Sequence, residues 1–141
     1  MTGYVATAEA DIGAAPEQVW AALTEPEQIK KYMFGSEVVT DWQPGGSIVW
    51  RGEYEGKRYE DKGQVLEVEP GRRLTVTHFS PLSGQEDVPE NYHTVRYELE
   101  ARDGGTHVVL NQDNNGSEEE AEHSQQNWQL MLDGLKKTVE G

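Results

Sequence analysis

Hydrophobic and polar residues alternate with a period of two in several segments of the first 115 residues. In residues 4–12, Tyr4, Ala8 and Ile12 fall on one face, whereas Glu9 and Asp11 fall on the other. This period is typical of a half-buried strand, because successive side chains of a strand point to opposite faces. Further strands, bounded mostly by glycine, proline or asparagine turn signals, are predicted at residues 38–39, 47–54, 58–68, 73–79, 92–101 and 106–113.

Two short segments after the first strand have helical spacing instead. Pro16 opens the first, residues 16–24, as proline does at a first helical position. Val19 and Leu23 lie on the same side of this helix. A second short helix is predicted at about residues 27–32.

The strongest helical pattern lies at the C-terminal end of the chain. Ser117 followed by Glu120 has the spacing of a capping box, so the helix is predicted to run from there to Glu140. At 1.5 Å per residue it is about 35 Å long, enough to cross a small domain. Its apolar stripe is formed by Ala121, Trp128, Met131, Leu132, Leu135 and Val139.

This order of elements predicts the α+β class. A curved antiparallel sheet of about six to seven strands needs a cover for its apolar face, and the C-terminal helix is the only large one available. No repeat or linker divides the chain, so residues 1–141 are predicted to form one domain. A twisted sheet wrapped around one long helix leaves space between them, and we expect a pocket there.

The charge and composition exclude several classes of function. The 26 acidic and 12 basic residues give a net charge of −14, which disfavours nucleic acid and anionic membranes. A basic partner, a high-salt cytoplasm or simply a solvated surface would each fit this charge. The chain has no cysteine, no apolar run that could span a bilayer and no signal-like N-terminus, so we expect a cytoplasmic protein, with a monomer as the expected state.

Motifs along nearly the whole chain resemble one family. The segments are APEQVWAALTEPEQIKKYMFG (15–35), DWQPGGSIVW (41–50), GQVLEVEPGRRLTVT (63–77), GGTHVVLNQ (104–112) and NWQLMLDGLKKTVE (127–140). In this order they resemble the START-like, or SRPBCC, superfamily, and within it the branch homologous to the activator of heat-shock protein 90 ATPase. The chain departs from the family pattern at Tyr32, Phe34, Gln112 and Asn127.

The resemblance implies a helix-grip fold with a cavity between the sheet and the C-terminal helix. Relatives use this cavity for lipids, polyketides and flavonoid-like molecules, and some perform cyclase or aromatase chemistry in it. Part of the branch stimulates a heat-shock chaperone ATPase and is tied to the stress response. The leading hypothesis is therefore a binding or carrier protein for a small apolar molecule, with a co-chaperone module and a cavity enzyme as alternatives.

Period-two counting predicts which residues face the pocket. Histidines and tyrosines there could orient a polar group of the ligand, or His78, His93 and Tyr97 could act in acid–base chemistry. The simpler alternatives are hydrogen-bonded rim histidines and aromatic residues that only fill the core. The candidate ligand-binding residues are Trp50, Tyr54, Val65, Val76, His78, His93, Val95, Tyr97, Val108, Leu110, Trp128, Met131 and Leu132.

No catalytic or metal-binding motif stands out. The four histidines lack the spacing of a metal site, and no nucleophile or phosphate-binding motif is present. We therefore predict no catalytic residue, no metal and no cofactor. Residues 80–91 form a long loop between two predicted strands, which is either a lid over the pocket or only a connection.

Overall fold

The computed structural model describes residues 1–33 and 35–141, with the side chains of Tyr54 and Leu82 left outside the description. Within these residues, seven strands form one antiparallel sheet in the order β1-β7-β6-β5-β4-β3-β2. The strands are β1 (Tyr4–Ile12), β2 (Glu37–Val39), β3 (Ser47–Tyr54), β4 (Lys57–Glu69), β5 (Arg73–His78), β6 (His93–Arg102) and β7 (Gly105–Asn115).

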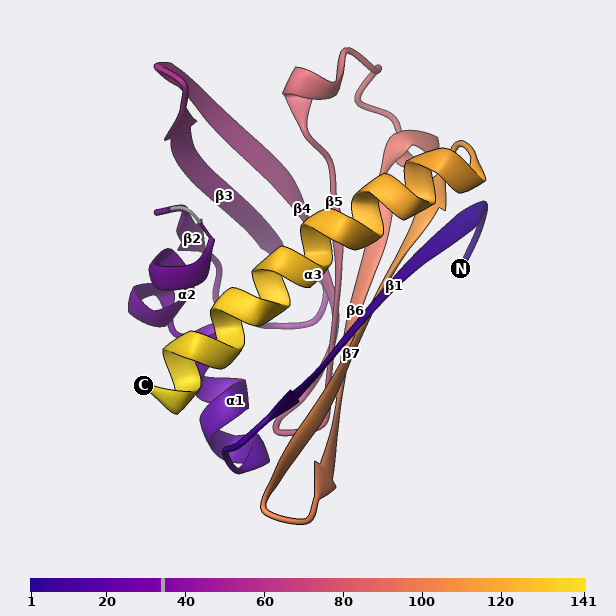
Figure 1. Ribbon diagram of the computed structural model, residues 1–141. Helices are drawn as coiled ribbons and strands as arrows, with labels where there is room; N and C mark the ends of the chain where they lie inside the picture. Colours follow the sequence, from indigo (N-terminus) through magenta and orange to yellow (C-terminus); the bar gives the residue numbers. More distant parts are fainter. Residues whose placement is uncertain (34) are drawn as a thin grey trace.

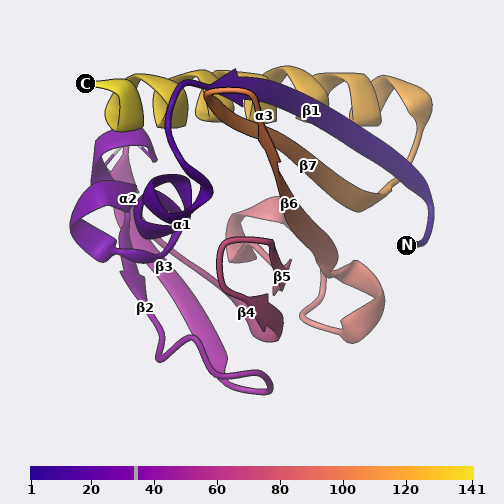
Figure 2. The same ribbon diagram turned by 90° about the horizontal axis from the view of Figure 1, so that it is seen from below.

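Helix α3 lies across the concave face of this sheet (Figure 1). Seen from below, the strands curl beneath α3, while α1 and α2 cover one end (Figure 2). The helices are α1 (Pro16–Thr24), α2 (Pro26–Tyr32) and α3 (Glu118–Glu140), with single 3-10 turns η1 (Pro81–Ser83) and η2 (Pro89–Asn91). The prediction of an α+β helix-grip fold is confirmed, and the predicted element bounds differ from the observed ones by two residues at most.

The N-terminus of α3 is capped by side chains. Ser117 Oγ accepts a hydrogen bond from the Glu120 backbone N–H at 3.1 Å. The Glu120 carboxylate accepts from the Gly116 N–H at 2.8 Å, one residue before the position expected for a capping box. These contacts satisfy backbone donors that the helix leaves free, so α3 begins where the sequence predicts.

Polar side chains of α3 tie the helix to β1 and to the residue after it. Gln129 Nε2 donates to the Glu9 carbonyl at 2.8 Å, and Lys136 Nζ donates to the Asp11 carbonyl at 2.6 Å. The Glu140 carboxylate accepts from the Gly13 N–H at 2.7 Å. These bonds hold α3 along the β1 edge of the sheet, so the space beneath its apolar stripe has a defined position.

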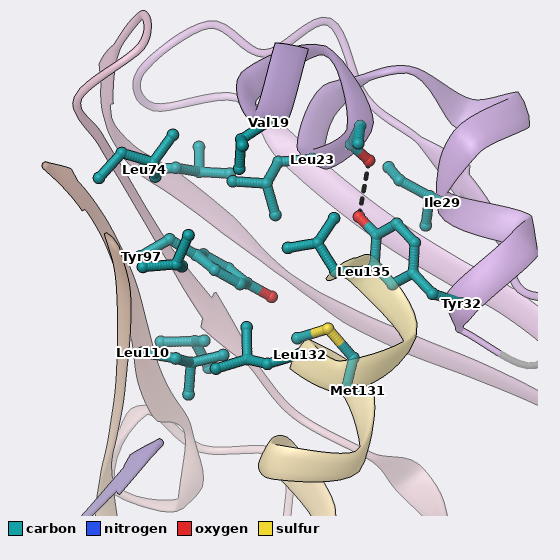
Figure 3. Packing of buried hydrophobic residues seen from close by; sticks show 14 of the residues in the cluster. Val19, Leu23, Ile29, Tyr32, Leu74, Tyr97, Leu110, Met131, Leu132 and Leu135 are labelled. Atoms are coloured by element: carbon teal, nitrogen blue, oxygen red, sulfur yellow. Dashed lines mark hydrogen bonds between the residues drawn. The ribbon is translucent and has the colours of Figure 1, made fainter. Parts of the chain in front are cut away.

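The apolar core fills the region between α3, the two short helices and the middle of the sheet (Figure 3). Leu132 and Leu135 of α3 are fully buried, as are Val108 and Leu110 of β7. Tyr32 also lies in this core, where its hydroxyl donates to the Ala22 carbonyl at 2.7 Å. Burial of such side chains stabilises the fold by about 1.5–3 kcal/mol each.

The loop of residues 80–91 is attached to strand β4 and to the residue after β5. The Asp87 carboxylate forms an ion pair with Lys62 of β4 and accepts a hydrogen bond from the Tyr92 hydroxyl at 2.6 Å. The Tyr92 ring stacks on Phe79, with ring centroids 5.0 Å apart. No described side chain of this loop lines the cavity beneath α3. The geometry therefore indicates that this loop is a connection bound to β4 and not a lid over the cavity.

Acid is expected to release this loop. The bond from Lys62, and then that from Tyr92, hold the pKa of Asp87 below its ordinary value of 3.8. A depressed carboxyl pKa stabilises the folded state above the unfolded pKa, and this contribution is lost as the pH falls through the folded value. We expect hydrogen-exchange protection of residues 80–91 to fall below about pH 4.

In the Asp87→Asn variant, the hydrogen-exchange protection of this loop should already be low at pH 7. Lowering the pH should then cause no further loss of protection that is specific to the loop. Glu86→Gln is the matched control, because it removes a carboxylate from the same loop that takes part in none of the described ion pairs. Equal protection of wild type and Asp87→Asn at pH 7 would contradict the role of this ion pair.

Candidate ligand cavity

A cavity of about 270 Å³ lies between the concave face of the sheet and α3. Strands β3 to β6 supply most of its wall, the segment after α2 supplies one side, and α3 closes it. Among the residues that the structure describes, twelve line it: Met33, Ser36, Trp50, Tyr59, Asp61, Val76, His78, Val95, Tyr97, Asn127, Trp128 and Met131.

The pleat of the sheet explains why these strand residues share one face. Trp50 of β3 stands directly opposite Asp61 of β4, and Val76 of β5 stands opposite Val95 of β6. Paired residues in an antiparallel ladder project to the same side. The period of two then adds His78, two residues beyond Val76, to the same wall.

Asp61 and His78 form a polar pair within this wall. His78 Nε2 lies 2.9 Å from Asp61 Oδ2, and the two side chains are only 24% and 18% exposed. The Trp50 ring meets the imidazole edge-on, with centroids 5.0 Å apart. His78 Nδ1 and Asp61 Oδ1 are buried without a hydrogen-bond partner among the residues that the structure describes. This pair is the part of the wall where polar atoms are left unsatisfied.

A second polar contact borders the cavity beside α2. The Tyr59 hydroxyl of β4 forms a hydrogen bond with Ser36 Oγ, and Ser36 is buried. The Tyr59 ring lies across Gly52 of β3, where a Cβ would come within 2.6 Å of the ring carbon bearing the hydroxyl. Gly52 therefore leaves the room that brings Tyr59 against the cavity.

Tyr97 of β6 is buried beneath α3. Figure 3 shows its hydroxyl pointing toward the helix, among Leu132, Leu135 and Met131. Burial raises the pKa of Tyr97 well above its ordinary value, so the phenol stays neutral. A neutral phenol can both donate and accept a hydrogen bond, but it does not supply a negative charge.

Seven of the residues that the sequence pattern places in the pocket lie on the wall of this cavity. They come from β3, β5, β6 and α3, as the alternation of side chains and the helical stripe predict. These residues are Trp50, Val76, His78, Val95, Tyr97, Trp128 and Met131.

Five other candidates lie elsewhere. Val65, Val108, Leu110 and Leu132 are completely buried in the packed core, because neighbouring side chains fill the space in front of them. His93 faces the N-terminal end of α3, where its Nδ1 lies 2.8 Å from the Asp113 carbonyl. The Tyr54 side chain lies outside the described residues.

Five described residues on the cavity wall are not among the thirteen candidate ligand-binding residues. Tyr59 and Asp61 have the same period-two phase as Val65, so strict counting along β4 could have found them. Asn127 precedes Trp128 on the helix and looks polar and solvated in the sequence. Met33 and Ser36 come from the segment after α2, for which no periodic signal exists.

The described residues offer neither a metal site nor a membrane-spanning helix. No group of three or more histidine, aspartate or glutamate side chains there could hold a metal ion. No described helix is long and apolar enough to cross a membrane. The cavity is therefore the feature of this part of the chain with the clearest capacity to bind a molecule.

Three solved structures illustrate what this fold is similar to. ChR145 from Cytophaga hutchinsonii is 50% identical, with a TM-score of 0.86 over 99% of this chain and 96% of that one. The Aha1 dimer from Colwellia psychrerythraea is 19% identical, with a TM-score of 0.73 over 96% of each chain. DynU16, from the dynemicin biosynthetic locus, is 18% identical, with a TM-score of 0.79 over 96% of this chain and 47% of that one.

A search of curated proteins found no match. A family model does match, and it spans residues 13–140, nearly the whole chain. The match covers both short helices, strands β2 to β7 and all of α3, and the matched span contains the described residues that line the cavity. The chain therefore belongs to the family described as Activator of Hsp90 ATPase homolog 1-like protein.

Proposed function

We propose that this protein binds and carries a small, mostly apolar molecule in the cavity beneath α3, and that residues 1–141 act as one domain in doing so. The observation that carries the proposal is the composition of the wall. Aliphatic and aromatic side chains dominate it, and a few polar groups converge at Asp61, His78 and Tyr59. Pockets of this kind bind by apolar burial, while the polar groups set the orientation of the ligand.

The volume of the cavity limits the size of the molecule. Pockets for drug-sized ligands measure about 300–1,000 Å³, whereas this cavity measures about 270 Å³. A compound with one or two rings fits that space better than a sterol or a long acyl chain. Within the ligand classes implied by the sequence, the size therefore favours compact aromatic molecules over lipids.

The experiment is an amide NMR titration with a panel of one- and two-ring aromatic compounds, short fatty acids and sterols. Saturable shifts should gather on β3 to β6 and the middle of α3, and the small aromatic compounds should produce them at the lowest concentrations. Shifts that gather on the convex face, or a complete lack of saturable shifts across the panel, would reject the proposal.

Closing the cavity mouth is expected to weaken ligand binding strongly. Asn127 lines the cavity from an exposed position on α3, so the Asn127→Trp variant places an indole at the mouth without removing core contacts. We expect the affinity for a panel hit to fall at least about tenfold, with little change in stability. Leu130→Trp is the matched control, since Leu130 is 65% exposed on the solvent side. Equal affinities for both variants would contradict binding in this cavity.

A second candidate function comes from the family description, which names an activator of Hsp90 ATPase. The Colwellia neighbour is an Aha1 protein with the same fold. If this chain has such a role, purified protein should stimulate the ATPase of an Hsp90 chaperone from the same organism. The Asn127→Trp variant separates the two functions, because blocking the cavity should leave stimulation by an outer surface unchanged.

A further inference from the structure

We infer that the cavity selects a cationic ligand, namely an ammonium group attached to a small apolar body. This inference rests on the proposed function and adds the charge of the ligand to it. It depends on two independent features of the wall, its uncompensated carboxylate and its aromatic side chains, each of which is present in the described residues.

The first feature is a carboxylate in a wall whose described side chains include no lysine or arginine. Asp61 is the one carboxylate among the described side chains that line the cavity, and neither lysine nor arginine is among them. Asp61 is also only 18% exposed, so water screens its charge poorly. A ligand that brings a positive charge would supply the counter-charge that the cavity wall lacks.

His78 occupies only one of the two oxygens of this carboxylate. Its Nε2 lies 2.9 Å from Asp61 Oδ2, as expected when Nε2–H donates to the carboxylate. Its Nδ1 is buried and has no described partner. In an imidazolium this atom would carry a buried, unpaired N–H, whereas in the neutral ring it is only an acceptor. Asp61 Oδ1, which has no described partner, is the oxygen of this pair that an ammonium group of a ligand would contact.

The second feature is an aromatic wall around the same space. Trp50, Tyr59, Tyr97 and Trp128 line the cavity from β3, β4, β6 and α3. Aromatic rings attract ammonium groups through their negative faces, and this attraction grows when water is excluded. Burial keeps Tyr97 neutral, so these rings do not add a competing charge. A cavity that places aromatic side chains around a carboxylate is suited to bind an organic ammonium ion.

Neutral and anionic ligands lack this advantage. A neutral alcohol of the same shape keeps the apolar contacts and can donate to Asp61, but it leaves the carboxylate charge uncompensated. A carboxylate ligand would face Asp61 at short range in a poorly screened site. The expected order of affinity is therefore ammonium, then alcohol, then carboxylate, for one and the same apolar body.

The test uses three soluble compounds with one phenyl ring and different charges: 2-phenylethylamine, 2-phenylethanol and 3-phenylpropanoate. Their affinities for the wild-type protein are measured at pH 7 by NMR titration, at low and at high salt. We expect the ammonium compound to bind about tenfold more tightly than the alcohol. The carboxylate should bind more weakly than both.

Two variants separate the buried charge from the overall charge of −14. Asp61→Asn keeps the size of the side chain and an acceptor for His78, and it should reduce the preference for the ammonium compound to about threefold or less. Glu60→Gln removes the same charge from the neighbouring residue, which pairs with Arg51 and does not line the cavity, so it should keep the preference. High salt should also leave most of the preference intact, because a buried charge is weakly screened.

The outcomes distinguish this inference from the proposed function. If the alcohol binds as tightly as the ammonium compound to wild-type protein, the charge selection is wrong and the carrier function stands. The same holds if Asp61→Asn and Glu60→Gln lower the preference equally, because the general surface charge then explains it. If none of the three compounds, nor any member of the wider panel, binds, the proposed function itself fails. If Asp61→Asn does not fold, the wild-type comparison at low and high salt still decides the question, because a preference that comes from the overall surface charge would disappear at high salt.

Discussion

The Gly63→Ala variant is expected to lose about 3 kcal/mol or more of folding free energy, a large effect for the addition of one methyl group. A Cβ at this position of β4 would lie 1.8 Å from the Thr77 carbonyl oxygen and 2.5 Å from the carbonyl carbon. Both are backbone atoms of β5. A flexible side chain could move aside, whereas here one strand must shift against the other.

The position of Gly63 explains why the strands approach so closely. On one side it pairs with Ile48 of β3, and on the other its neighbours bond to β5 and the residue after it. The Lys62 N–H donates to the Phe79 carbonyl at 3.0 Å, and the Gln64 N–H donates to Thr77 Oγ1 at 2.9 Å. The methyl group would therefore break contacts that join the outer strands β2 to β4 to the rest of the sheet.

Urea unfolding, followed by tryptophan fluorescence, measures this loss. Gly13→Ala is the matched control, because a Cβ there meets only the flexible Glu140 side chain, at 3.4 Å. We expect Gly13→Ala to change the free energy of unfolding by less than about 1 kcal/mol. If Gly63→Ala were as stable as this control, the close approach of β4 and β5 would be wrong.

The same close approach positions the cavity. Asp61 lies two residues before Gly63, and His78 follows Thr77, so the Asp61–His78 pair bridges the two strands just beside the contact. A partly folded Gly63→Ala protein should therefore show altered signals for His78 and Trp50 before changes appear in α1 or α2. Histidine and indole resonances in NMR spectra provide that readout.

Most of the fold could be predicted from the sequence because its elements are strongly periodic. In β1, β3 and β6 the alternation of side chains allows only one orientation of the strand that buries its apolar face. The apolar stripe of α3 fixes the orientation of the helix in the same way. Turn signals such as Pro44-Gly45-Gly46 and Asp103-Gly104-Gly105 then limit where the strands end. In this chain the local sequence preferences and the global fold agree, so the hydrophobic pattern and the turn residues predict the elements correctly.

The cavity was harder to predict, because periodicity gives the face of a residue and not its distance from a neighbour. Val76 and Leu110 both point to the concave side, yet one lines the cavity and the other is packed in the core. Asp61 was overlooked because a charged residue on a strand is more often solvated than inward-facing. Ser36 follows α2 outside any periodic segment, and only the tertiary fold brings it to Tyr59.

The second large effect is expected for Leu132→Ala, which should cost about 3 kcal/mol, within the range of about 2–5 kcal/mol for such truncations. Leu132 is completely buried, and Figure 3 shows it pointing from α3 toward Leu110 of β7, beside Tyr97. Its removal leaves a void among side chains held by two rigid elements. Because the sheet and the helix cannot collapse fully into that void, the cost exceeds the simple loss of apolar burial.

Its two sequence neighbours provide the comparison. Leu130 is 65% exposed, so Leu130→Ala should change the free energy of unfolding by less than about 0.5 kcal/mol. Met131 is 5% exposed but already borders the cavity, so part of its surface has no packing partner to lose. Met131→Ala should therefore cost less than Leu132→Ala, about 2 kcal/mol.

The ligand preferences of the Met131→Ala and Leu132→Ala variants should differ more clearly than their free energies of unfolding. Met131→Ala enlarges the cavity itself, so it should shift the preference toward bulkier aromatic compounds. Leu132→Ala opens its void in the packed core behind the wall, so the order of affinities should remain that of the wild type despite the greater loss of stability. Urea unfolding and the ligand titration, performed on both variants, measure the two effects independently. If Leu132→Ala changed the ligand preference and Met131→Ala did not, the assignment of Met131 to the cavity wall and of Leu132 to the packed core would be wrong.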